Sequence, residues 1–172
     1  MQRASGSLGN RFAADLAREG SLRPALASFV EAVRTAGGLE RGRRGADHIL
    51  PDPHGASGCK RLLLFLRWMV RPDDGVDLGL WADRVPTSVL LMPIDTHLFK
   101  LSKNLGLTTR AGVTWATAEE VTAGLRRIDP DDPVRFDFAL CHLGMVQRCP
   151  SRRDPVRCEG CGVRPLCVHW RR

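Results

Sequence analysis

Apolar side chains recur every three or four residues through most of this 172-residue chain, which is the period of an amphipathic α-helix. The first pattern predicts one helix within residues 11–36, which Ser21 could cap and the glycine pair at 37–38 could end. Residues 37–58 are rich in Gly, Pro, Arg and His and predict a long loop. Residues 59–71 are apolar on nearly every side, so we expect a central, largely buried helix there.

Three more helices are predicted in the second half of the chain. One begins at Asp95, which occupies the N-cap position after an extended or tightly turned segment, and it ends at Gly106. The second covers residues 118–128, and the third opens at Asp132-Pro133, where a capping residue precedes a proline. Strand patterns are nearly absent, because the chain has no Tyr and few alternating Val or Ile residues. The prediction is therefore an all-α fold.

Composition restricts the possible environments of the chain. It is 43% hydrophobic and 26% charged, as in ordinary globular proteins, and its longest apolar runs, residues 62–66 and 89–92, are too short to cross a bilayer. The N-terminus has no secretory signal pattern, so we expect a reducing compartment, in which the six cysteines do not form disulfides. This predicts a cytoplasmic protein with no membrane partner.

Positive charge is concentrated at the C-terminus. The formal net charge is +7, and residues 148–172 alone carry +5, because seven arginines stand against Asp154 and Glu159. A cationic segment of this kind is typical of polyanion binders, since each neutralised phosphate releases a counterion. Proteins from arginine-rich genomes have a similar composition, so charge alone leaves both interpretations open. The seven residues are Arg148, Arg152, Arg153, Arg157, Arg164, Arg171 and Arg172.

Three of the basic residues in the apolar helix predicted at 59–71 share one face of it. Lys60, Arg67 and Arg71 recur at i, i+7 and i+11, which places them on one narrow stripe of the helix. We expect this stripe to face solvent or a ligand. A solvated edge on a buried helix is the simpler explanation.

Four cysteines within nineteen residues give the strongest chemical signal. Their spacing is Cys149-x8-Cys158-x2-Cys161-x5-Cys167, and such a density of thiols in a reducing compartment indicates a metal site. Zinc sites with four cysteines usually pair two close knuckles, whereas this segment has one C-x2-C knuckle between wider gaps. The spacing therefore favours a 4Fe–4S cluster, with zinc as the alternative. Cys59 and Cys141 lie in apolar helices and are expected to be small buried hydrophobes.

The cysteine spacing resembles the iron–sulfur loop that ends endonuclease III and the adenine-specific mismatch glycosylases. Those enzymes have six residues in the first gap, where this chain has eight. Residues 94–100, Ile-Asp-Thr-His-Leu-Phe-Lys, are also similar to the V-D-T-H-I-F-R segment of endonuclease III, and they precede the cysteines by about fifty residues, as they do there. Asp137, Cys141, His142 and Gly144 resemble the helix that leads to the cluster. Together these matches cover residues 91–170.

Two further resemblances involve the central helix. Residues 59–71 and 76–81 are similar to an uncharacterised bacterial family of unknown function, whose N-terminal portion is longer, so part of the barrel of helices is expected to be absent. The hairpin is the poorest match, because glycosylases carry L-P-G-V-G-[RK]-K-T-A about eighteen residues before the aspartate, whereas here Gly55-Ala56-Ser57-Gly58-Cys59-Lys60 precedes Asp95 by thirty-five. The extra residues, about 71–86, would form an insertion. A glycine turn that opens a helix can still present backbone N–H groups to a phosphate.

The resemblance implies a helix-hairpin-helix DNA glycosylase of base-excision repair, in the cytoplasm at the bacterial nucleoid, acting as a monomer on double-stranded DNA that contains a damaged or mismatched base. Asp95 would assist cleavage of the N-glycosidic bond of a flipped nucleotide. Lys60 would be the nucleophile of an accompanying AP lyase step, if there is one. The implied DNA contacts are Gly55, Gly58, Arg67, Arg71, His97, Arg148, Arg152, Arg153 and Arg157. The expected units are a helical glycosylase-like domain, 1–147, and a basic cluster loop, 148–172.

Two alternatives stay open at this point. The first is a DNA-binding but non-catalytic protein, in which the metal site stiffens a basic loop and Asp95 only caps its helix. The second is an iron–sulfur or zinc protein unrelated to DNA, such as an electron carrier. An electron carrier has no evident need for so many arginines around the cysteines.

Overall fold

Helices form the regular structure of the part of the chain that the computed structural model describes, residues 6–146 and 148–171. The α-helices are α2 (Leu8–Glu19), α3 (Leu22–Gly37), α4 (Arg44–Ile49), α5 (Lys60–Val70), α6 (Thr96–Asn104), α7 (Trp115–Arg126) and α8 (Asp137–Val146). The 3-10 turns η1 (Thr87–Val89) and η2 (Arg164–Leu166) add short segments. No strand occurs in these residues, which confirms the all-α prediction. The domain boundary predicted at residue 147 lies outside the described residues.

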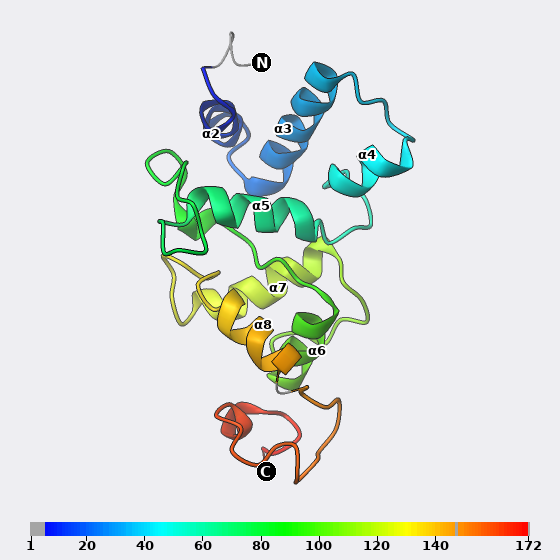
Figure 1. The fold of residues 1–172 in the computed structure, drawn as a ribbon, viewed down its shortest axis with the longest axis vertical. Coiled ribbons are helices and arrows are strands. Elements are labelled where there is room, and N and C mark those ends of the chain that lie inside the picture. The colour runs from blue at the N-terminus through cyan, green and yellow to red at the C-terminus, as the bar shows by residue number, and fades with distance from the viewer. Residues whose placement is uncertain (1–5, 147, 172) are drawn as a thin grey trace.

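The helix α5 crosses the middle of the molecule (Figure 1). On one side of it lie α2, α3 and α4, and on the other lie α6, α7 and α8. The segment that carries the four predicted ligand cysteines forms the end of the molecule farthest from the N-terminus. Among the described residues, no helix combines the length and the apolar character needed to cross a membrane.

The N-terminal region contains two helices where the sequence predicted one. Ser21 does occupy the N-cap position of α3, and Gly38, with φ of 62°, ends that helix as expected. A separate helix precedes it, however, because Gly20 adopts φ of 69° and closes α2 in a left-handed turn. Ser7 caps α2 by accepting a hydrogen bond from the backbone of Asn10 at 3.1 Å.

The core is built around α5 and one aromatic cluster. Leu63, Leu66 and Val70 are at most 1% exposed, which confirms that α5 is the buried central helix. Trp81 lies within 5.4 to 6.1 Å, between ring centroids, of Phe12 from α2, Phe29 from α3 and Phe65 from α5. Gly9 of α2 allows this approach, since a Cβ atom there would stand 2.6 Å from the Trp81 ring.

An extended segment leads from η1 to the start of α6, as predicted. Leu90, Met92 and Ile94 are each at most 1% exposed, so this segment passes through the core. The Met92 N–H donates to the Thr122 hydroxyl of α7 at 2.9 Å, which satisfies a buried backbone donor. The segment therefore fixes Asp95, the residue that follows it, relative to the helices around it.

Two predicted boundaries are wrong. The loop predicted at 37–58 contains α4, which is tied to α3 because Arg34 donates to the Asp47 carboxylate at 2.6 Å. The last helix begins at Asp137 rather than at Pro133, after a turn over residues 133–136. Asp132 lies too far before Asp137 to cap this helix, and its carboxylate binds Arg71 at 2.9 Å.

Candidate functional site

The fold brings the two predicted catalytic residues into direct contact. Lys60 is the first residue of α5, Asp95 is the N-cap of α6, and they are 35 residues apart in the sequence. Their side chains form an ion pair in which Lys60 Nζ lies 3.1 Å from Asp95 Oδ2. Lys60 is 45% exposed and Asp95 18% exposed, so the pair is accessible from solvent. An amine and a carboxylate at this distance can exchange a proton.

Asp95 is held in its ionised form by its surroundings. Partial burial raises the pKa of the carboxyl group, but the backbone N–H of Leu98 and the ammonium of Lys60 lower it by more, and the net pKa lies below the usual value. The Leu98 N–H donates to Asp95 Oδ1 at 2.7 Å, which is the predicted N-cap bond. One carboxylate oxygen therefore caps α6 and the other faces Lys60.

The turn before Lys60 is tightly packed. Cys59 has φ of 51°, a left-handed conformation that lets the chain enter α5, and its thiol is buried as predicted. Gly58 is buried against Val113, where an added Cβ would lie 2.9 Å from that side chain. Gly55 is exposed and closes a turn by donating its N–H to the carbonyl of Asp52 at 3.0 Å. Of the two glycines predicted to contact DNA, only Gly55 lies on the surface.

The other predicted DNA contacts on the helices separate into exposed and buried residues. His97, in the first turn of α6, is exposed. Arg67 is a correction, because its side chain is only 6% exposed and its guanidinium binds Asp137 at 2.5 Å and Asp77 at 3.2 Å. The expectation that Arg67 faces solvent or a phosphate is therefore wrong: buried carboxylates take up its hydrogen bonds.

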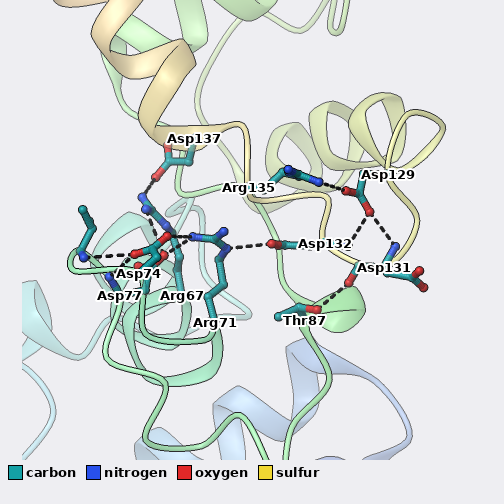
Figure 2. Close-up of polar contacts among 11 residues, drawn as sticks. Arg67, Arg71, Asp74, Asp77, Thr87, Asp129, Asp131, Asp132, Arg135 and Asp137 are labelled. Atoms are coloured by element: carbon teal, nitrogen blue, oxygen red, sulfur yellow. Dashed lines mark hydrogen bonds and ion pairs between the residues drawn. The ribbon is translucent and has the colours of Figure 1, made fainter.

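Arg71 belongs to the same buried network (Figure 2). Its side chain is 13% exposed and binds Asp77, Asp74 and Asp132, the last at 2.9 Å. The predicted contact between Arg71 and DNA is thus also a correction. The network joins the end of α5 to the segment after it and to the turn before α8, so it stabilises the fold (Figure 2).

Asp137 connects this network to the Lys60–Asp95 pair. Burial raises the pKa of the Asp137 carboxyl above its usual value despite the attraction of Arg67, and the nearby Asp95 carboxylate raises it further, whereas Lys60 lowers it. The helix that Asp137 opens then runs along α6, and Gly144 lies against the backbone of His97. The sequence resemblance included Asp137 but assigned it no function. Nothing in the sequence around Asp137 indicated that Arg67, 70 residues earlier, would pair with it.

The four predicted ligand cysteines line one cavity. Leu101 and Leu105 at the end of α6, together with Trp170, provide its apolar walls. Cys158 is buried, and the other three are partly buried. Among the described residues, no three His, Cys, Asp or Glu side chains are arranged to hold a single metal ion. The thiols thus converge on one enclosed space, and their arrangement, by chemical type and enclosure, fits a sulfur-ligated group.

The thiol of Cys149 is partly buried and accepts a hydrogen bond from Asn104. Burial raises its pKa, the side-chain N–H of Asn104 lowers it, and the neighbouring cysteines raise it, so that the net pKa is above the usual value. Asn104 Nδ2 lies 3.2 Å from Cys149 Sγ. Sequence analysis missed Asn104, because a lone asparagine at the end of a helix gives no sign of what lies beside it.

The arginines of the cysteine loop are exposed, as DNA contacts would be. Arg148, Arg152, Arg153 and Arg157 all lie on the surface. Arg153 and Arg164 both lie over the Trp170 ring, at 4.2 and 3.9 Å from its centroid. Arg157 is 3.8 Å from Asp154. Arg172 lies outside the described residues.

Cys141, which was predicted to be buried, is only partly buried.

Comparison with known proteins identifies the family. Residues 1–146 match the family described as "Protein of unknown function (DUF2400)", and because this match covers most of the chain, the chain belongs to that family. No curated protein matches the sequence, and no solved structure matches the fold.

Proposed function

We propose that this DUF2400 member is a DNA glycosylase that removes a damaged or mismatched base from double-stranded DNA, with a 4Fe–4S cluster in its cysteine loop. The observation that carries the proposal is the contact between Lys60 and Asp95. Two residues that the sequence resemblance singled out, 35 positions apart, meet at 3.1 Å on an accessible surface. A nucleophilic amine beside a carboxylate is an arrangement that can cleave an N-glycosidic bond.

The arrangement of α4, the turn at 50–59 and α5 supports the helix-hairpin-helix part of the proposal. Two helices are joined by a turn that contains glycines, and Lys60 stands at the N-terminus of the second helix. The backbone N–H groups at a helix N-terminus favour a phosphate group. DNA bound at this turn would bring its backbone close to the Lys60–Asp95 pair.

Lys60 and Asp95 would have distinct tasks. In the lyase version, Asp95 accepts a proton from Lys60 Nζ, and the free amine attacks C1′ of the flipped nucleotide. A bond forms between Nζ and C1′ as the bond from C1′ to the base breaks, and the base leaves with the electron pair and takes up a proton. Opening of the sugar ring gives a Schiff base. Loss of a C2′ proton then forms a C2′–C3′ double bond as the phosphate leaves C3′ with the electron pair of the C–O bond, and water releases the amine. In the hydrolytic version, water attacks C1′ and gives its proton to Asp95, and the strand stays intact.

The cysteine loop would supply the DNA-binding surface. Four thiolate bonds to a cluster would cross-link residues 149–167 and hold the exposed arginines in place, while the shape and charge of the loop determine where the phosphates lie. Cys149, Cys158, Cys161 and Cys167 would hold the cluster, and their common cavity supports this. The zinc alternative is distinguished by a spectrum, because a cluster absorbs near 400 nm and zinc does not.

A non-catalytic DNA-binding protein is the second candidate. It is favoured by the fact that Asp95 already has two structural partners, the Leu98 N–H and Lys60. An aspartate that caps a helix and neutralises a lysine needs no further task.

Incubation of the purified protein with a panel of lesion-bearing duplexes, followed by alkali, tests the two candidates. Base excision gives alkali-sensitive sites, and borohydride traps a protein–DNA adduct if Lys60 is the nucleophile. Asp95→Asn should abolish excision and keep DNA binding, because asparagine still caps α6. Lys60→Ala should abolish the adduct. Lys103→Ala serves as the lysine control, because Lys103 lines a pocket between α6 and the cysteine loop, together with Ser151 and Val168. Normal excision by Asp95→Asn would overturn the catalytic assignment, and binding without excision of any lesion would favour the second candidate.

A further inference from the structure

Asn104 is the residue that joins the cysteine loop to the rest of the protein. It is the last residue of α6 and is only 4% exposed. Its side-chain Nδ2 donates to the carbonyl of Pro150 at 2.7 Å and to Cys149 Sγ at 3.2 Å. Its backbone carbonyl accepts a hydrogen bond from the N–H of Val168 at 2.7 Å. One buried side chain therefore contacts the segment that enters the loop, and its backbone contacts the segment that leaves it.

The orientation of the Asn104 amide follows from these partners. His169 Nε2 lies 3.1 Å from Asn104 Oδ1, and an amide oxygen only accepts, so His169 donates here through an N–H at Nε2. The opposite orientation of the amide would bring its oxygen against the Pro150 carbonyl oxygen, which is repulsive. Both N–H groups of the amide thus point at the loop, one of them at a cysteine sulfur.

Hydrogen bonds to ligand sulfurs are one of the factors that determine the reduction potential of an iron–sulfur cluster. We propose that Asn104 is a positioning residue that holds the cysteine loop onto α6 and raises the reduction potential of the cluster through its hydrogen bond to Cys149. This inference rests on the proposed cluster. It assigns a function to a residue outside the four ligands and outside the Lys60–Asp95 pair.

The position of Asn104 also connects the two candidate sites. The helix α6 carries Asp95 at its N-cap and Asn104 at its last position, and its nine residues rise about 1.5 Å each along the axis. One short, rigid element therefore separates the carboxylate that faces Lys60 from the amide that faces Cys149. Release of the loop from Asn104 would free the C-terminal end of the helix that positions Asp95.

The test compares Asn104→Asp and Asn104→Ala with a matched control, Ser102→Ala. Asp has the size of Asn but cannot donate a hydrogen bond to sulfur. Ser102 is 1% exposed on the same helix, and its hydroxyl has no hydrogen-bond partner among the described residues. Each full-length protein is reconstituted with iron and sulfide without oxygen, and the reduction potential and the rate of iron loss to a chelator are measured. Both Asn104 variants should show a more negative potential and several-fold faster iron loss, and Ser102→Ala should behave as wild type. Unchanged values in the Asn104 variants would overturn the inference and leave the proposed function intact.

A second measurement does not depend on the cluster. The bonds from Asn104 to Pro150, Val168 and His169 need no metal, so the metal-free Asn104→Ala protein should be cut by trypsin after Arg152, Arg153 or Arg157 several-fold faster than wild type. Equal rates of cleavage in the two proteins would also overturn the inference. If wild-type protein takes up no iron, it is the cofactor in the proposed function that fails, and the trypsin comparison still decides the position of Asn104.

Discussion

Arginine occurs in two contrasting regions of this molecule. At the C-terminal end of α5, Arg67 is buried and Arg71 is partly buried, and each binds at least two carboxylates (Figure 2). In the cysteine loop the arginines are exposed, and only Asp154 and Glu159 accompany them in the sequence. Sequence analysis treated both groups as DNA contacts. The number of aspartates nearby in space, and not the arginine itself, separates a structural cation from one that is free to bind a phosphate.

The difference has an energetic consequence. Burial of an arginine costs several kcal/mol of desolvation, which carboxylates at hydrogen-bond distance offset. Without the arginine, the aspartates of the network would be left buried and unpaired. An exposed arginine stays hydrated in the free protein and loses water only when a partner binds. We therefore expect substitutions on α5 to change stability and substitutions in the loop to change binding.

The largest effect is expected from Arg67→Met. The substitution keeps apolar bulk but leaves Asp77 and Asp137 buried without their shared cation, which typically costs about 3–5 kcal/mol of unfolding free energy. Urea denaturation followed by circular dichroism measures it. Arg61→Met is the matched control, because Arg61 lies on the same helix but is exposed, where a substitution changes stability by about 0.5 kcal/mol or less. Equal midpoints for the two variants would contradict the structural assignment of Arg67.

Removal of the proposed metal group should make the loop more open to proteolysis and leave the stability of the helical core unchanged. Chelation, or Cys158→Ser, should make the arginines of the loop several-fold more sensitive to trypsin, because the cysteine cavity has lost the group that cross-links it. The urea midpoint of the helical part should hardly change, since the network around Arg67 and Arg71 contains no cysteine. A cooperative loss of both regions would show that the loop is part of the core.

The third prediction concerns the exposed arginines. The double variant Arg152→Ala/Arg153→Ala should weaken DNA binding, and each lost phosphate contact should reduce the slope of log K against log salt by about 0.9. Fluorescence anisotropy at several salt concentrations measures it. Arg18→Ala is the control, because α2 lies at the opposite end of the molecule from the loop (Figure 1). An unchanged slope in the double variant would show that the loop does not contact the phosphates.

The comparison also explains how much the sequence could predict. Local signals were sufficient for α3, α5 and α6, because the apolar period and a capping residue such as Asp95 act within a few positions of one another. The same local reasoning missed α2, whose end depends on the left-handed conformation of Gly20. It also missed α4, which is held by Arg34 from the preceding helix.

The sequence likewise predicted some features of the candidate site and missed others. The spacing of the cysteines predicted that they converge, and resemblance to a known segment selected Asp95 and Lys60, which do meet. Neither source could predict the partners of Arg67, because Asp137 is 70 residues away and their contact depends on where the fold places the first residue of α8. Asn104 was missed for the same reason, since its partners Cys149 and Pro150 lie about 45 residues further along the chain.

The smallest effect is expected at Asp137, and it depends on pH. Burial holds the pKa of its carboxyl above the usual value, so the folded protein retains this proton at a pH where the unfolded chain has released it. The contribution of Asp137 to stability is therefore greatest at low pH and is lost as the pH rises through the raised pKa. Asp137→Asn stays neutral and still offers Arg67 an oxygen, so its stability relative to wild type should rise between acid and neutral pH. Urea midpoints of both proteins across that range measure the difference. A constant or opposite difference would mean that Arg67 compensates the burial of Asp137 in full, and the buried network would then be balanced in charge rather than acidic.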